Sequence, residues 1–172
     1  MAKNVKKFEA VLSEHATSLW GHHFIVPEAV SKFYKHKKIK RLICTLNETH
    51  QFHCAMTSKG EGVYFIILNA EIRKKHKLKV GDSFKIILQE DDSKYGMPMP
   101  EEFDELLKQD PEGYAIFQEL TPGKQRTLIY IVLKPKSSEV RLRKALTIVN
   151  HLKLNGGHID FKQLNEEMKL KK

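Results

Sequence analysis

The chain has little of what marks an enzyme family, a secreted domain or a membrane protein. Its 172 residues include only two cysteines, too few for a disulfide framework. No stretch approaches the roughly 20 apolar residues of a membrane-spanning helix. The basic N-terminus has neither the apolar segment nor the small-residue cleavage site of a secretory signal. We therefore expect a cytoplasmic protein that does not enter the membrane.

Recognisable catalytic motifs are also missing. The sequence has no Gly-x-Ser-x-Gly, His-Glu-x-x-His or Walker-type loop, the spacings that position a nucleophile, a zinc ion or a phosphate. We therefore expect a protein that is not an enzyme and needs no cofactor. The enzymatic alternative requires His22, His23, His50 or His53 to converge with carboxylates in a cleft, because catalytic triads are recognised by geometry.

The two cysteines allow a zinc alternative. Cys44, His50, His53 and Cys54 are four potential ligands within a short segment. A hairpin with its turn near Thr49 instead places the two cysteines opposite each other on an apolar face, with His53 on the other face. Because free cysteine is among the most buried residue types, we favour reduced, buried thiols and expect no metal.

The first half of the chain repeats itself at an offset of 42 residues. Apolar residues then coincide in six pairs: Phe24 with Ile66, Val26 with Leu68, Val30 with Ile72, Leu42 with Phe84, Cys44 with Ile86, and Leu46 with Leu88. Such self-similarity predicts two like units that pack about a pseudo-twofold axis and share one core. Within each copy, the pattern indicates a strand, a second strand, a short helix and a closing strand.

After residue 92 the sequence pattern changes. Two prolines and a glycine in 95–100 indicate an extended linker, which we place at 93–99. Three helix starts follow at Pro100, Asp110-Pro111 and Thr121-Pro122, each with a proline at or beside the first turn. The apolar run 127–133 resembles a strand in composition, but the Thr121 cap favours a helix. Spacing of i, i+3, i+4 and i+7 predicts a further helix over 139–154.

We therefore predict an α+β protein with four regions. They are a pseudo-twofold double-split β-barrel domain over 3–92, the linker over 93–99, a small all-α domain over 100–157, and a loosely ordered tail over 158–172.

Positive charge exceeds negative charge, and the net charge is +9. Residues 1–92 carry 16 Lys and Arg against 10 Asp and Glu, whereas the remainder carries 14 against 11. Each repeat contains a basic block, over 35–41 in the first copy and 73–79 in the second. A polyanionic partner would account for this surplus. The alternative is a solvated surface that only keeps the protein soluble.

Part of the second copy resembles the AbrB/MazE/MraZ-type double-split barrel. The matching segments are 65–73 and 78–86, an apolar strand, a helical turn with Arg73, a Gly81-Asp82 turn and another strand. Asn69 stands where that family prefers proline. The first copy keeps Pro27 but has Ile39-Lys40 in place of Gly-Asp.

Over residues 5–157 the chain is similar to a second family, the YdeI/OmpD-associated, bacteriocin-protection-like group, which carries an N-terminal barrel of unknown function. The matching stretches are 24–27, 78–82, 100–103, 110–111, 117–122, 130–131 and 139–143. This resemblance implies two fused swapped-hairpin halves followed by a small helical domain, with no established activity. A barrel completed within one chain implies a monomer with internal pseudo-symmetry.

The resemblances also imply candidate site residues. AbrB-type proteins that bind DNA do so through basic residues of two subunits, so a phosphate-binding face would comprise Lys37, Lys38, Lys40, Arg41, Arg73, Lys74, Lys75 and Lys77. Arg141 and Arg143 match a recurrent arginine motif of the YdeI/OmpD-associated family. They would bind a ligand or form ion pairs with Glu101, Glu102, Asp104 or Glu105.

Two functions follow as hypotheses. The first is a non-enzymatic protein that binds DNA or another polyanion through the paired basic blocks. The second is a stress or bacteriocin (antimicrobial-peptide) protection factor that acts through a protein or small-ligand partner, and it predicts a concave apolar pocket between barrel and helices.

Overall fold

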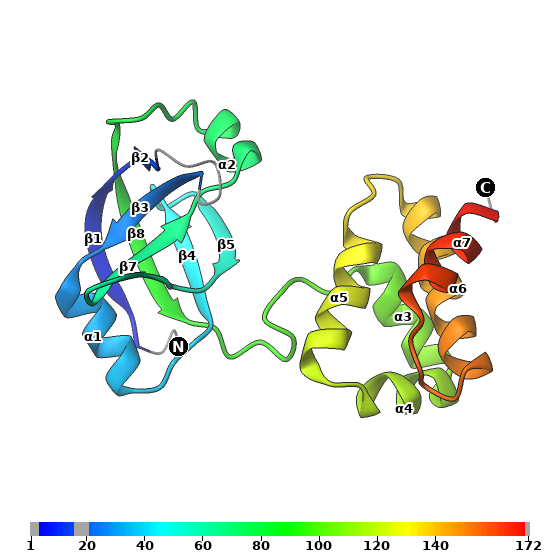
Figure 1. The fold of residues 1–172 in the computed structure, drawn as a ribbon. Helices are drawn as coiled ribbons and strands as arrows, with labels where there is room; N and C mark the ends of the chain where they lie inside the picture. Colours follow the sequence, from blue (N-terminus) through cyan, green and yellow to red (C-terminus); the bar gives the residue numbers. More distant parts are fainter. Residues whose placement is uncertain (1–3, 16–20, 171–172) are drawn as a thin grey trace. The chain divides into compact units, whose positions relative to one another are not determined.

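The computed structural model describes residues 4–15 and 21–170, so Trp20 lies outside the described residues. The chain divides into two compact units, Met1–Asp92 and Ser93–Lys172. The first contains β-strands and two helices, and the second contains helices only (Figure 1). The α+β class expected from the sequence is confirmed. Within the described residues, none of the helices combines the length and the hydrophobicity that a bilayer-spanning segment requires.

The first unit consists of two antiparallel sheets of four strands each. One sheet has the order β1-β8-β4-β5 and the other has the order β2-β3-β7-β6. The strands are β1 (Lys6–Val11), β2 (Ser13–Glu14), β3 (His22–Val26), β4 (Leu42–Leu46), β5 (His50–Cys54), β6 (Thr57–Gly60), β7 (Val63–Ile67) and β8 (Ser83–Glu90). The helices are α1 (Glu28–His36) and α2 (Ala70–Lys75).

The strand register pairs equivalent residues of the two sequence repeats. In the β3–β7 ladder Phe24 lies opposite Ile66, and in the β4–β8 ladder Thr45 lies opposite Ile87. Each of these residues therefore pairs with its own counterpart 42 positions along the chain. Antiparallel strands related by a local twofold axis have this register, because the axis passes through the self-matched pair.

Three details of the sequence expectation are corrected by the strand pairing. Each copy has three strands before its helix, not two, since β1-β2-β3-α1-β4 is followed by β5-β6-β7-α2-β8. The two sheets remain separate four-stranded sheets in the described residues and do not close into a barrel through ladder bonds. The β4–β5 hairpin exists, but its register places Cys44 opposite Phe52 and Leu42 opposite Cys54. This two-residue shift keeps both thiols on the same face.

The sheets share one apolar core because alternate residues of each strand point inward. Buried residues of both sheets and both helices belong to it, including Phe24, Ile66, Leu42, Leu46, Phe84, Ile86, Leu88, Tyr34 and Ile72. The Tyr34 hydroxyl lies 2.7 Å from the carbonyl oxygens of Asn4 and Leu88, which satisfies the polar end of a buried ring. Burial raises the pKa of this phenol.

The helices of the two copies end in the same way. Lys38 follows α1 with φ of 57°, and Lys77 follows α2 with φ of 53°. In each case the next amide donates to a carbonyl five residues earlier, Ile39 to Tyr34 and Leu78 to Arg73. This is the Schellman pattern, in which the left-handed position usually belongs to glycine. A lysine at that position therefore carries a backbone cost in both copies.

The second unit packs four helices around α6. The helices are α3 (Glu101–Gln109), α4 (Pro111–Glu119), α5 (Pro122–Leu133), α6 (Ser138–Leu154) and α7 (Phe161–Leu170), and α6 contacts each of the other four. The caps expected at Asp110 and Thr121 are confirmed, since their side chains accept bonds from the amides of Gly113 and Lys124. The helical interpretation of 127–133 is also confirmed, because it lies inside α5.

Both ends of this unit pack against its core. The tail expected to be loosely ordered contains α7, whose Leu164 is buried against the helical core. In the segment expected to be an extended linker, Tyr95, Met97 and Met99 pack against the same core. On α6, Leu142 and Leu146 keep about two fifths of their surface exposed, so the buried stripe runs through Ala145, Ile148, Val149 and Leu152.

Candidate functional site

The two basic blocks lie at opposite ends of the first unit. The first block begins in the last turn of α1 and leads into β4 at Leu42. The second begins in the last turn of α2, where Lys75 Nζ lies 3.4 Å from Nδ1 of His50. His50 is paired with Leu46, at the other end of β4. Figure 1 likewise shows α1 and α2 at different ends of the sheets. The blocks are therefore two separate basic surfaces, each built by one copy of the repeat.

The first block gathers its side chains around two adjoining hollows. Lys37, Lys38, Lys40 and Arg41 line one hollow of about 290 Å³ together with Glu90 and Asp91. Lys37 Nζ also donates to Asn4 Oδ1 over 2.8 Å. Part of the positive charge of this block therefore faces carboxylates of its own chain.

The second block is more dispersed. Arg73 turns back to its own helix start, where its Nε donates to the carbonyl oxygen of Leu68 over 3.3 Å. Lys74, Lys75 and Lys77 are exposed on α2 and the turn that follows it. The Nε of Arg73 is therefore used in a backbone contact, and the exposed lysines supply most of the accessible charge of this block.

The two C-terminal arginines differ from each other. Arg141 forms a two-pronged ion pair with Glu102, with Nε and Nη2 between 2.8 and 3.0 Å from the carboxylate oxygens. The bonds from Arg141 hold the pKa of Glu102 at about 2, and Arg141 has a raised pKa in return. Arg141 therefore joins α6 to α3. Arg143 is half-buried on α6, and its carbonyl oxygen accepts a bond from Thr147.

The histidines considered as an enzymatic cluster are distributed over different places. His22 lies 3.7 Å from a Glu14 oxygen, and His53 Nδ1 lies 2.9 Å from Oδ2 of the buried Asp91. His50 packs edge-on against His76. No group of three or more His, Cys, Asp or Glu side chains suited to a metal ion occurs in the described part of the chain. A hydrogen bond with Cys54 and, to a lesser extent, burial raise the pKa of the Cys44 thiol.

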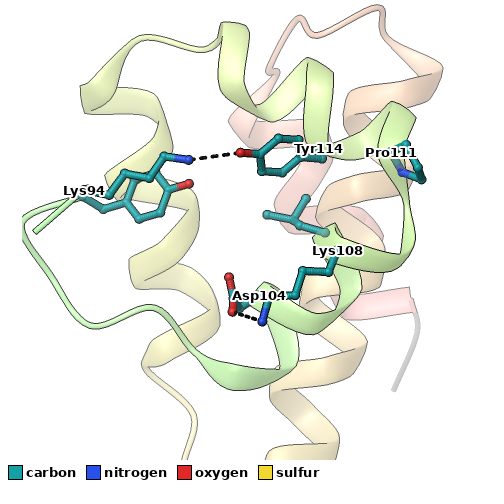
Figure 2. A pocket seen from close by; sticks show the side chains of 7 residues that line it. Lys94, Asp104, Lys108, Pro111 and Tyr114 are labelled. Carbon is teal, nitrogen blue, oxygen red and sulfur yellow. Dashed lines mark hydrogen bonds and ion pairs between the residues drawn. The ribbon is translucent and has the colours of Figure 1, made fainter.

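A cavity of about 450 Å³ lies in the helical unit, between the segment before α3 and the start of α4 (Figure 2). Its lining comprises Lys94, Tyr95, Asp104, Leu107, Lys108, Pro111 and Tyr114. Cavities of this size lie within the range of about 300–1,000 Å³ that is usual for small-molecule sites. The lining combines two phenol rings and two aliphatic side chains with a few charged groups.

The charged side chains of this cavity already contact neighbouring residues. Lys94 Nζ lies 3.2 Å from the Tyr114 hydroxyl and 5.2 and 5.3 Å from the ring centroids of Tyr95 and Tyr114. The bond to Tyr114 raises the pKa of Lys94. Lys108 Nζ contacts Asp104 and Glu105 at 2.8 and 2.7 Å. Figure 2 shows the Lys94–Tyr114 and Asp104–Lys108 contacts on two sides of the cavity. What it offers to a ligand is therefore mainly its aromatic and aliphatic surface.

Sequence reasoning did not identify this cavity. Tyr95 lies in the segment read as a linker, and Tyr114 lies on an exposed face of α4. The available signal was an aromatic residue beside prolines, since Tyr95 also packs on the buried Phe117, with ring centroids 5.9 Å apart. Packing on Phe117 holds Tyr95 in the wall of the cavity. The sequence alone does not show that Tyr95 and Tyr114 line the same cavity, because they meet only in the folded chain.

Comparison with known proteins divides the chain at the same place as the structure does. Residues 97–155 match a family described as Bacteriocin-protection, YdeI or OmpD-Associated. Residues 8–88 match a domain of unknown function, DUF1905. No curated protein matches the chain. The family matches agree with the second resemblance drawn from the sequence.

Proposed function

We propose that this chain, in which a DUF1905 domain precedes a YdeI/OmpD-associated domain, is a non-enzymatic binding protein that contributes to protection against bacteriocins or related antimicrobial peptides. The description of the matched family names bacteriocin protection. The role in this chain would be exercised through a peptide or small-ligand partner held by the helical unit.

The observation that carries this proposal is the aromatic cavity. Tyr95, Leu107, Pro111 and Tyr114 present apolar surface around a space of about 450 Å³, while Lys94 and Lys108 are occupied by neighbours. Burial of a single aromatic or large aliphatic group there would contribute roughly 1.5–3 kcal/mol. The ligand would therefore present an apolar anchor, and binding would persist at high salt because burial of apolar surface depends little on ionic screening.

Two exposed tyrosines give a matched test. Tyr114 lines the cavity and is 42% exposed, whereas Tyr130 on α5 is 55% exposed and does not line it. Cells that express the chain should survive a bacteriocin challenge better than cells without it. Tyr114→Ala should abolish that advantage and Tyr130→Ala should retain it. Equal survival with wild type and Tyr114→Ala would refute the assignment of this cavity.

Nucleic-acid binding by the first unit is the second candidate. Its support is the clustering of Lys37, Lys38, Lys40 and Arg41 around one hollow, together with the net charge of +9. If six or more phosphates were engaged, affinity for mixed-sequence duplex DNA would fall about 10³-fold or more between 50 and 200 mM salt. A flat salt response, or no binding at low salt, would exclude this candidate.

We also propose that the first unit is an internally duplicated double-split arrangement related to AbrB-type proteins, and that the chain acts as a cytoplasmic monomer. The self-matched pairs Phe24–Ile66 and Thr45–Ile87 support the duplication. Sedimentation of the full chain tests the monomer, because a twofold arrangement completed by two copies in one chain requires no second subunit.

A further inference from the structure

A second cavity, in the first unit, is lined by three lysines and by no acidic residue. It measures about 490 Å³ and lies beside the end of α1 and the turn between β5 and β6. Its lining comprises Lys35, Lys38, Ile39, Lys40, Ala55, Met56 and Tyr64. Three ammonium groups therefore border a surface built from an aliphatic side chain, a thioether, a methyl group and a phenol ring.

Within the described residues, the lysines of this cavity form no ion pair. Across residues 4–15 and 21–170, no carboxylate lies within ion-pair distance of Lys35, Lys38 or Lys40, although Glu90 and Asp91 line the adjoining hollow. Lys35 lies over the Tyr64 ring, with Nζ 4.9 Å from the centroid. Three like charges border the same cavity, so an anion placed there would be attracted to all of them.

The backbone also holds one of these lysines in a costly conformation. Lys38 occupies the left-handed region at φ of 57°, where glycine would be free of the Cβ penalty. Its amide and that of Ile39 donate to the carbonyl oxygens of Lys35 and Tyr34, so the turn that carries Lys38 is held by two backbone bonds. Ile39 then turns inward and packs against the core of the unit. This turn brings a cation and an apolar side chain to the same cavity.

We propose that this cavity binds a small amphipathic anion, a carboxylate or phosphate ester with an aliphatic chain. The anionic group would lie among Lys35, Lys38 and Lys40, and the chain would lie on Ile39, Met56 and Tyr64. A small ligand of this kind fits the observations better than a nucleic acid, because more than half of the lining is apolar. A duplex backbone would contact the lysines but leave that surface unused.

The repeat supplies a matched control for the lysines. Lys77 occupies the equivalent left-handed position after α2, with φ of 53°, and does not line this cavity. Lys38→Gln and Lys77→Gln therefore remove the same charge from the same kind of turn at opposite ends of the unit. Met56→Gln tests the apolar surface, and thermal unfolding of each variant checks that the chain still folds.

The test is calorimetric titration of the full chain with monomeric laurate, and with dodecyltrimethylammonium as the cationic counterpart of equal chain length. We expect one laurate per chain, at least tenfold preference for laurate over the cation, and at least fivefold weaker binding in Lys38→Gln and in Met56→Gln. Lys77→Gln should stay within twofold of wild type. Vesicles of phosphatidylglycerol form a separate arm, in which binding by wild type and loss in Lys38→Gln identify a lipid headgroup as the source of the anion.

Several results would overturn the proposal. These are no laurate binding, equal binding of the anion and the cation, or an equal effect of Lys38→Gln and Lys77→Gln. Displacement of laurate by a 20-base-pair duplex, with Lys77 contributing as much as Lys38, would assign the surface to nucleic acid instead. None of these outcomes depends on the tyrosine cavity of the helical unit.

Discussion

Gly113 on α4 lies close to Val149 on α6, and replacing it by alanine should destabilise the helical unit. A Cβ atom at this position would lie 2.6 Å from Cγ1 of Val149 and 3.1 Å from Cγ of Asp110. Both neighbours are held in place, since Val149 is buried in the core and the Asp110 carboxylate caps α4 and accepts from Lys153.

The expected magnitude follows from two opposing effects. Alanine is favoured over glycine inside a helix by about 1 kcal/mol. Forcing an extra methyl group into a packed contact costs about 1–3 kcal/mol, and displacing the Asp110 cap costs about 1 kcal/mol more. The net loss for Gly113→Ala is therefore about 1–3 kcal/mol. For a domain of this size, each kcal/mol lowers the midpoint of thermal unfolding by about 4–8 °C.

Gly123 provides the matched comparison. It lies in the first turn of α5, and a Cβ atom there would meet no other atom within 4 Å. Gly123→Ala should therefore leave stability unchanged or raise it by up to about 1 kcal/mol. The measurement is thermal unfolding of the full chain followed by circular dichroism at 222 nm. The reasoning would be refuted if Gly113→Ala melted at or above the wild-type temperature, or if adding Val149→Ala left the cost of Gly113→Ala unchanged.

Three further predictions concern charge, strain and the last helix. The pKa of Glu102 is lowered from 4.5 to about 2, so its pair with Arg141 stabilises the fold above pH 4.5 and this stabilisation is lost as the pH falls toward 2. The difference in unfolding free energy between wild type and Glu102→Gln, measured in urea, should therefore shrink between pH 4.5 and pH 2. A constant difference would contradict this. Lys38→Gly should stabilise the first unit by about 0.5 kcal/mol in denaturant titrations. Relief of the left-handed backbone conformation outweighs the extra conformational freedom of glycine in the unfolded chain. A lower denaturant midpoint than wild type would show that the backbone at Lys38 is not strained. His151 contacts Glu167 at 3.0 Å and accepts a bond from the Asp160 amide at 3.3 Å. His151→Leu should therefore speed amide hydrogen exchange in α7 about tenfold or more, while exchange in α3 stays unchanged. Unaltered exchange in α7 would show that these bonds do not hold the helix.

Much of the fold could be predicted because local chemistry and packing agree in these segments. The Asp110 and Thr121 caps determine where α4 and α5 begin, and they outweighed the strand-like composition of 127–133. The 42-residue offset predicted which strands are equivalent. Strand β6, with all four residues exposed, was missed because an exposed edge strand needs no apolar alternation.

The remaining features depend on contacts between distant residues. The hairpin register was predicted two residues out, because the turn begins at Asn47 and Glu48, both with positive φ, and the sequence has no glycine there to mark it. The ion pair between Arg141 and Glu102 was one of several pairings open at the sequence level. Neither cavity was predicted, since Tyr95 with Tyr114 and Lys38 with Met56 meet only after the chain has folded.

The interleaved strand order means that neither copy of the repeat can fold by itself. β1 is paired only with β8, and both neighbours of β4, β5 and β8, are made later. A growing chain on the ribosome therefore holds β1 without its hydrogen-bonded neighbour, and β4 paired with β5 alone, until β8 completes the unit. Formation of the first sheet requires closing a long loop, which slows folding and exposes apolar strands to misassembly. Two separately expressed fragments, cut between β4 and β5, should each remain unfolded and should associate into a native-like complex when mixed.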